Sequence, residues 1–344
     1  MKLLEPGSRS FDLLGLGEVM LRLTPPDRER LSMSESFEKT VGGSELNVTA
    51  GAAMLGARSG ILTKLPDNAM GQFVRNRIRY TGVSDDFLVM DRSREARLGV
   101  YYYEMGAYPR KSSVLYDRAR SSFTTLQASE LMDDPCHSTR AFHVSGITLG
   151  LGEGPRANAM DLIARFKRAG ALLSFDVNYR AALWGEDEAR AVIREVLPQV
   201  DILFVSEETS RRMLQRTGSV EDIARGFAAE YGCGIVAMTM RTASSPLRHS
   251  WASLLYESAT DTIHTEPAYE DIEVVDRIGS GDAYVGGVLG ALLTGRPLPE
   301  ALRTGNAMAA IKNTIWGDLP SSSWAELESI IRTHQGMEKG EMNR

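Results

Sequence analysis

Cysteine is scarce in this chain of 344 residues, which contains only Cys136 and Cys233. The two lie about a hundred positions apart and show no metal-ligand spacing, so we expect neither a disulfide framework nor a cysteine-based metal site. Long apolar runs are also missing, since the most apolar stretches, such as 283–293, are too short to cross a bilayer. The N-terminus lacks the charged start, apolar core and cleavage site of a secretory signal. These absences predict a reduced, cytoplasmic protein that does not bind a membrane.

Positive charge is not in excess either. The chain has 45 acidic residues against 39 basic ones, which gives a formal net charge of −6. A negative balance argues against nucleic acid or an anionic membrane as the main partner. An anionic substrate would therefore have to be bound by local arginines. The composition, with 43% hydrophobic and 24% charged residues, is that of a globular protein with one large core and an accessory domain.

The turn Gly279-Ser280-Gly281 precedes Asp282 and an apolar run of small residues. Glycines let backbone N–H groups converge, and a helix starting at Asp282 would add its N-terminus to a phosphate site. An acid beside bound phosphate can take the proton of an attacking hydroxyl, as phosphoryl transfer requires. The same letters also fit an ordinary turn in which Asp282 caps a helix.

Two further blocks carry candidate ligand-binding groups. Gly42-Gly43 leads into a small-residue run with helical spacing that contains Asn47, which fits a tight turn entering a buried helix. Asn178 and Arg180 follow the apolar strand 171–176, at the end where open α/β sheets place their ligands. The planar guanidinium of Arg180 suits a carboxylate, although the same arginine also fits a surface loop with an acidic partner.

Strands and helices alternate from residue 141 onward, which predicts a parallel sheet covered on both faces. His143 fits a buried strand position better than a ligand position. Residues 97–104 and 113–118 read as two strands joined by a turn, and 31–40 as part of a small exposed sheet. The period of two places Tyr101 and Tyr103 on one face of their strand.

The pattern Asp-x-x-Gly-x-Gly-Asp at 276–282, together with the Gly-Gly block at 42–43, resembles the ribokinase-like (phosphofructokinase B) carbohydrate kinases. Arg277 stands where the family usually has threonine, and Ser280 where it has alanine. The resemblance covers about 11–332. It implies one kinase domain over 1–332 with a three-layer α/β/α sandwich, a mostly parallel central sheet and a small β-sheet lid from about 20–40 and 97–118. Residues 333–344 are expected to form a polar tail.

On this resemblance Asp282 is the catalytic base. Sugar contacts fall on Gly42, Gly43, Asn47, Tyr101, Tyr116, Arg118, Arg180 and Asp318. Nucleotide contacts fall on Asn178, Ser206, Thr239, Arg241, Asn306 and the anion hole Gly279, Ser280 and Gly281. The family's metal-organising Asn-x-x-Glu reads Ser206 to Thr209 here, so Glu207 or Glu208 would meet Mg²⁺ through water. The serine and acids of this segment also fit a simple helix start.

Gly-x-Tyr followed by Tyr-x-Arg in the lid, and Asp-x-Asn-x-Arg-x-x-Leu-Trp at 176–184, are similar to the 2-keto-3-deoxygluconate kinases. The resemblance implies phosphorylation of that sugar acid at its 6-hydroxyl by ATP with Mg²⁺, in a homodimer formed through the lid. Alternatives are another sugar (fructose, keto-deoxygalactonate, ribose or a nucleoside) and a non-catalytic sugar-binding regulator, which would not need a base. A dinucleotide-dependent oxidoreductase is disfavoured, because Gly15-Leu16-Gly17 lacks the third glycine of the fingerprint.

Overall fold

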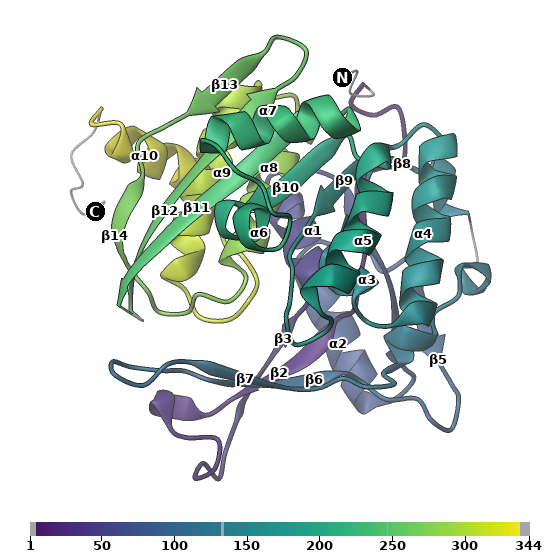
Figure 1. Ribbon diagram of the computed structural model, residues 1–344. Helices are drawn as coiled ribbons and strands as arrows, with labels where there is room; N and C mark the ends of the chain where they lie inside the picture. Colours follow the sequence, from purple (N-terminus) through teal and green to yellow (C-terminus); the bar gives the residue numbers. More distant parts are fainter. Residues whose placement is uncertain (1–4, 132–133, 246, 338–344) are drawn as a thin grey trace.

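The computed structural model describes residues 5–131, 134–245 and 247–337. Within them the chain forms a large sheet with helices on both faces and a separate, smaller sheet beside it (Figure 1). This confirms the α/β sandwich with a mostly parallel sheet and a second small sheet that the sequence predicts. No helix in these described ranges has the length and apolarity to cross a membrane.

The large sheet consists of β1 (Phe11–Leu16), β4 (Ser59–Pro66), β5 (Leu88–Asp91), β8 (Thr139–Ser145), β9 (Leu172–Asp176), β10 (Ile202–Ser206), β11 (Ile235–Ser245), β12 (Arg248–Glu257), β13 (Thr262–Thr265) and β14 (Tyr269–Glu273). Their order is β13-β12-β11-β10-β9-β8-β1-β4-β5, and β14 pairs with β12. The strands from β11 through β5 pair in parallel, whereas β12 pairs antiparallel with its neighbours. The carboxyl ends of β9, β10 and β11 therefore meet at one edge.

Two groups of helices cover the two faces of this sheet (Figure 1). One apolar cluster includes residues of α4 (Glu153–Arg168), α5 (Glu186–Val196) and α7 (Val220–Tyr231). The other includes residues of α1 (Ser44–Met54), α8 (Ser280–Leu293), α9 (Leu298–Asn313) and α10 (Trp324–His334). The remaining helices are α2 (Ala69–Tyr80), α3 (Gly146–Leu149) and α6 (Glu207–Arg212). Burial of these apolar faces is the main stabilising term of the sandwich.

The small sheet, called the lid below, has the strand order β3-β2-β6-β7. Its strands are β2 (Met20–Thr24), β3 (Glu38–Gly42), β6 (Val100–Glu104) and β7 (Ser113–Asp117). Tyr101 and Tyr103 are buried and Tyr102 is half-buried, as the predicted alternation requires. Residues 31–37 are not in a strand, so the expectation for 31–40 is correct only from Glu38 onward.

Helix α8 begins at Ser280, two residues before the predicted start at Asp282. Gly279 has φ +83°, and a Cβ there would overlap the main-chain oxygen of Asp318. The Gly279 carbonyl accepts a hydrogen bond from the Ala283 N–H at 2.8 Å, which closes the first helical turn. Asp282 therefore lies inside the first turn, where an acidic side chain is favourable.

Helix α10 extends to His334, so the first residues of the expected polar tail at 333–344 are helical. The His334 ring stacks on Tyr269 with ring centroids 3.7 Å apart, which joins the end of the helix to β14. The two rings lie nearly parallel, with an interplanar angle of 11°. The last part of the predicted tail, 338–344, lies outside the described residues.

Candidate active site

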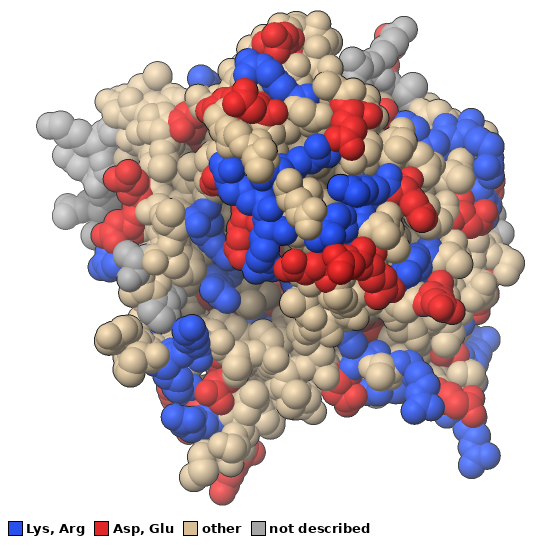
Figure 2. All heavy atoms as spheres, in the orientation of Figure 1, with Lys and Arg blue, Asp and Glu red and all other residues tan. Residues whose placement is uncertain are grey.

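A cavity of about 990 Å³ lies where the lid meets the carboxyl ends of β9, β10 and β11 and the start of α8. Figure 2 shows the molecule hollowed there, with basic and acidic side chains gathered above the hollow in the region of α6. The predicted site residues that line the cavity are Gly43, Asn47, Tyr101, Tyr116, Arg118, Asn178, Arg180, Ser206, Glu207, Glu208, Thr239, Arg241, Gly279, Ser280, Gly281, Asp282 and Asp318. Residues far apart in the sequence thus meet around one space.

Asp282 points into this cavity and accepts hydrogen bonds on both carboxyl oxygens. Ser44 Oγ donates to Oδ1 and Asn47 Nδ2 donates to Oδ2, each at 2.8 Å, and Asn178 Nδ2 lies 3.4 Å from Oδ1. Burial raises the pKa of Asp282, although the hydrogen bonds from Asn47 and Ser44 oppose the rise. A carboxylate offers about four lone-pair sites, so this one can still accept a proton from a substrate hydroxyl.

Backbone N–H groups beside Asp282 are available to an anion. Within the described residues, the N–H groups of Gly279, Gly281 and Asp282 have no acceptor, and that of Ser280 has a long contact of 3.4 Å to the Arg277 carbonyl. Free amides at the first turn of a helix form an anion site, to which the helix dipole contributes. The structure therefore places a carboxylate and an anion-binding turn side by side.

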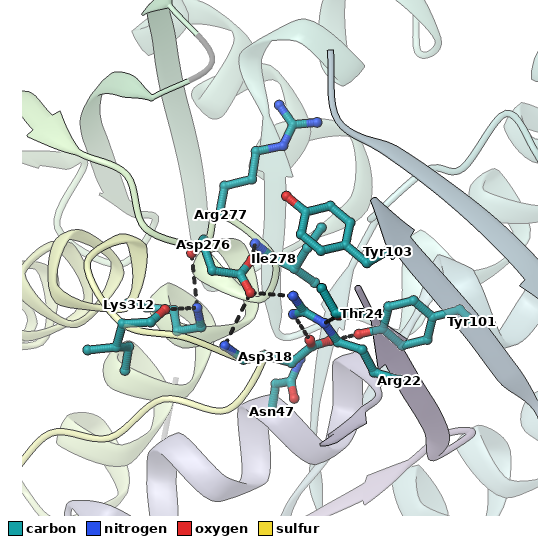
Figure 3. A network of polar contacts seen from close by, with 12 residues as sticks. Arg22, Thr24, Asn47, Tyr101, Tyr103, Asp276, Arg277, Ile278, Lys312 and Asp318 are labelled. Atoms are coloured by element: carbon teal, nitrogen blue, oxygen red, sulfur yellow. Dashed lines mark hydrogen bonds and ion pairs between the residues drawn. The ribbon is translucent and has the colours of Figure 1, made fainter. Parts of the chain in front are cut away.

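A buried polar network joins the lid to this turn (Figure 3). Arg22 of β2 is fully buried, and its two terminal nitrogens bind Asp318 Oδ1 at 2.6 Å and Asp276 Oδ2 at 2.5 Å. Tyr101 of β6 donates to Asp318 Oδ2 at 2.5 Å. Burial alone would lower the pKa of Arg22, but the charges of Asp318 and Asp276 raise it, so the guanidinium stays ionised.

Asp276 is fixed from three sides besides Arg22. Its Oδ1 accepts from the Ile278 N–H at 3.0 Å, and its Oδ2 from the Gly317 N–H at 3.1 Å. The buried Lys312 ammonium donates to the main-chain carbonyl of Asp276 at 3.1 Å and to that of Ile315 at 3.2 Å. Because Asp276 starts the anion-binding turn, these bonds hold the turn in place.

The two predicted substrate arginines differ in their partners. Arg118 binds the buried Glu18 through Nε at 2.8 Å and Nη2 at 2.5 Å, so its charge is already balanced. Arg180 is exposed and donates to the main-chain carbonyls of Asn178 and Tyr179 at 3.3 and 3.1 Å. Within the described residues it forms no ion pair, which leaves its positive charge to the cavity.

Two predicted site residues do not line the cavity. Asn306 is buried in α9, where its Oδ1 accepts from Trp251 Nε1 at 3.0 Å and Ser253 Oγ at 2.6 Å. Trp251 does line the cavity, so Asn306 supports the wall without forming it. Gly42 lies behind the wall, and a Cβ there would overlap Asp318 Oδ2.

Asp176 also lines the cavity, and the sequence alone indicated no role for it. It ends β9 and accepts from the Asn178 N–H at 3.0 Å. Burial and the neighbouring charge of Asp282 raise the pKa of Asp176 to about 7. A carboxyl that shares a site with another carboxyl is pushed toward its neutral form.

Sequence reasoning also missed Ser44 and Arg22. Ser44 follows the Gly-Gly block directly, and its hydroxyl donates to the Asp282 carboxylate. Arg22 interrupts an otherwise apolar stretch between Met20 and Leu23, and a charged residue in such a strand signals a buried partner. Its two partners, however, lie more than 250 positions away (254 for Asp276 and 296 for Asp318), so only the fold could identify them.

Comparison with known proteins is consistent with this geometry. The family model described as pfkB family carbohydrate kinase matches residues 11–318. A 2-dehydro-3-deoxygalactonokinase from Haloferax volcanii is 36% identical over 321 residues, covering 93% of this chain and 96% of the relative. The crystal structure of a 2-dehydro-3-deoxygluconokinase from Thermotoga maritima superposes with a TM-score of 0.88 at 32% identity, covering 93% and 98% of the two chains.

A more distant structure shares the fold. It is a putative ribokinase II from E. coli in complex with ATP and Mg²⁺, with a TM-score of 0.81 at 19% identity, covering 94% of this chain and 100% of that one. The family model spans most of the chain and includes both the lid strands and the anion-binding turn. The chain therefore belongs to the pfkB family of carbohydrate kinases.

Proposed function

We propose that this kinase transfers the γ-phosphoryl group of ATP to the 6-hydroxyl of 2-keto-3-deoxygluconate, with Asp282 as general base. The observation that carries the proposal is the pairing of the Asp282 carboxylate with free main-chain amides at the start of α8, in one cavity. Phosphoryl transfer depends chiefly on such positioning and on electrostatic stabilisation.

In this mechanism Asp282 accepts the proton of the 6-hydroxyl as its oxygen bonds to the γ-phosphorus. The bond from that phosphorus to the β–γ bridging oxygen breaks, and ADP leaves. The N–H groups of Gly279, Gly281 and Asp282 stabilise the charge on the moving phosphoryl group. Ser44 and Asn47 keep the carboxylate oriented, because each donates to one of its oxygens.

The residues present fit a Mg²⁺ ion held through water. Glu207 and Glu208 line the cavity, and each uses one carboxyl oxygen for an arginine four positions later. No group of three or more His, Cys, Asp or Glu side chains that could hold a metal occurs in the described ranges. Mg²⁺ commonly keeps several waters and binds one or two carboxylates plus substrate phosphates. A bound Mg²⁺ ion would offset the negative charge of the nucleotide phosphates.

An acidic sugar is the substrate class that the arginines support. The charge of Arg118 is balanced by Glu18, so it offers hydrogen bonds, whereas Arg180 also offers an uncompensated charge. A guanidinium matches a carboxylate with two parallel hydrogen bonds. Tyr101 and Tyr116 line the lid side of the cavity, with ring centroids 5.9 Å apart, and provide an apolar wall over the sugar.

The epimer 2-keto-3-deoxygalactonate is the second candidate, because the Haloferax volcanii relative named for it is 36% identical over nearly the whole chain. A coupled assay of ADP release with both epimers, fructose and ribose tests the substrate class. We expect kcat/KM to be highest for a keto-deoxy sugar acid. A preference for fructose or ribose would contradict the role given to Arg180.

The base is tested by Asp282→Asn, which keeps the size of the side chain and removes its basicity. We expect kcat to fall by about a thousandfold, with the dissociation constants of both substrates changed only a few-fold. Asp187→Asn, at a carboxyl that is 96% exposed, is the control. A variant at 282 that keeps more than about a tenth of the turnover would refute general-base catalysis by this residue.

A further inference from the structure

Five arginines line the cavity, and two of them pair with carboxylates. Arg118 binds Glu18 and Arg211 binds Glu207. In the part of the chain that the structure describes, the other three form no ion pair. These are Arg180, Arg241 and Arg277. A kinase cavity with three guanidinium groups outside any ion pair is suited to an anion with several charges.

Arg277 is placed beside the anion-binding turn but takes no part in the network behind it. Its neighbour Asp276 turns inward to Arg22, whereas Figure 3 shows the Arg277 side chain directed away from these residues. Arg277 is exposed and still lines the cavity, and no side chain in the described residues accepts a hydrogen bond from it. Its contribution to holding the fold together is therefore small.

Arg277 and Arg241 also repel one another. The pKa of Arg241 is lowered by burial and by the charge of Arg277, although the charge of Glu208 opposes the fall. The buried His249 responds in the same way, with a pKa lowered to about 4 by burial and by the charges of Arg241 and Arg277. Like charges held close raise the free energy of the protein, and a bound polyanion relieves this.

We propose that Arg277, assisted by Arg241, binds the terminal phosphate of the nucleotide and stabilises the charge on the migrating phosphoryl group. This rests on the proposed function. Arg277 donates hydrogen bonds to the phosphoryl oxygens and exchanges no proton, since the hydroxyl proton goes to Asp282 and the bridging oxygen leaves with ADP. An arginine on a transferring phosphoryl group acts on the charge that spreads over its oxygens. Arg180, whose charge acts on Asp282 and Asp176, stays with the sugar acid.

The first test compares Arg277→Thr and Arg277→Lys with Arg225→Thr, a surface arginine whose partner Asp261 lies outside the cavity. We expect Arg277→Thr to lower kcat about a hundredfold with the KM of the sugar changed only a few-fold. The lysine variant should recover part of the loss, because it restores the charge without the planar fork. The control should match the unaltered protein, and all melting temperatures should agree.

The second test needs no turnover and no knowledge of the sugar. Calorimetry measures the binding of ATP and of ADP, each with Mg²⁺, to the unaltered protein and to Arg277→Thr. We expect the unaltered protein to bind ATP more tightly than ADP, and the variant to lose most of this preference. An unchanged preference together with an unchanged kcat would overturn the role of Arg277. If instead no sugar acid is phosphorylated by the unaltered protein, the proposed function fails while the binding comparison still decides the role of Arg277.

Discussion

At the scale of single residues, Asp176 shows how burial and a neighbouring carboxylate act on one acid of the cavity. Its pKa is raised to about 7 by burial and by Asp282, whereas an aspartate in an unfolded chain ionises near pH 4. Between about pH 4 and pH 7 the folded protein therefore holds a proton on Asp176 that the unfolded chain has lost. By linkage, the stability contributed by this group is present at low pH and is lost as the pH rises through the folded pKa.

Asp176→Asn tests this assignment. The amide oxygen can still accept from the Asn178 N–H, but the side chain no longer ionises. We expect the melting temperature of the variant to be close to that of the unaltered protein at about pH 5 and to exceed it by a few degrees at about pH 8. Thermal denaturation across this range measures the difference, and a gap that does not grow with pH would show that Asp176 is already ionised.

Arg22 poses the opposite case, a cation that two buried carboxylates require. Arg22→Met would leave Asp276 and Asp318 without their shared partner, so we expect a loss of about 3–5 kcal/mol in the free energy of unfolding. Arg79→Met is the matched control, because its pair with Asp85 is half-exposed and Arg75 keeps the carboxylate paired. Its effect should stay below about 1 kcal/mol in urea unfolding. Equal losses in the two variants would contradict a structural role for the buried pairs.

At the scale of elements, the outer strand of the lid is left unpaired on one side. Among the residues that the structure describes, β7 pairs only with β6, and all five of its residues are exposed, including Val114, Leu115 and Tyr116. Natural sheets cover or charge such edges to prevent unwanted pairing. We expect a second copy of this chain to cover this edge, as the resemblance implies.

Leu115→Glu tests the pairing of lids, since it places a charge on an exposed apolar position of β7. We expect the unaltered protein to sediment as a dimer at micromolar concentration and the variant to shift toward the monomer. Tyr80→Glu, another exposed large side chain but located on α2, is the control. A monomeric unaltered protein at all concentrations would contradict the prediction.

At the scale of the whole molecule, the fold was predictable because its signals are local. Alternating apolar strands and helices, the Gly-Gly block and the Gly-Ser-Gly-Asp turn each span a few residues, and together they indicate the sandwich and Asp282. Segment ends were less predictable. The start of α8 depends on the left-handed conformation of Gly279, and the end of α10 on the stacking of His334 against Tyr269.

The partners of the site residues could not be predicted in the same way. Arg22 meets Asp276 and Asp318 across 254 and 296 positions, and Asn306 turns toward Trp251 because a buried indole N–H needs an acceptor. Such contacts depend on tertiary packing and leave no periodic trace in the sequence. Many of the site residues could be identified from the sequence, whereas the residues that contact them could not.

The same long-range contacts predict one cooperative unfolding transition for the molecule. Arg22 belongs to the lid, but its partners belong to segments that flank α8 and follow α9, so the lid cannot open at its root without exposing buried charge. Circular dichroism of the helices and tryptophan fluorescence, to which Trp316 beside Arg22 contributes, should give coincident melting curves. An earlier fluorescence transition would show that the lid unfolds separately.

The burial of Arg22 also limits how this enzyme can be recombined with its relatives. A chimaera that exchanges the lid strands alone would replace Arg22, which contacts Asp276 and Asp318, by the residue that the donor has at that position. Unless that residue is an arginine, two acids of the recipient would be stranded in the interior. Transplanted sugar specificity should therefore require grafting the residues at positions 276 and 318 along with the lid.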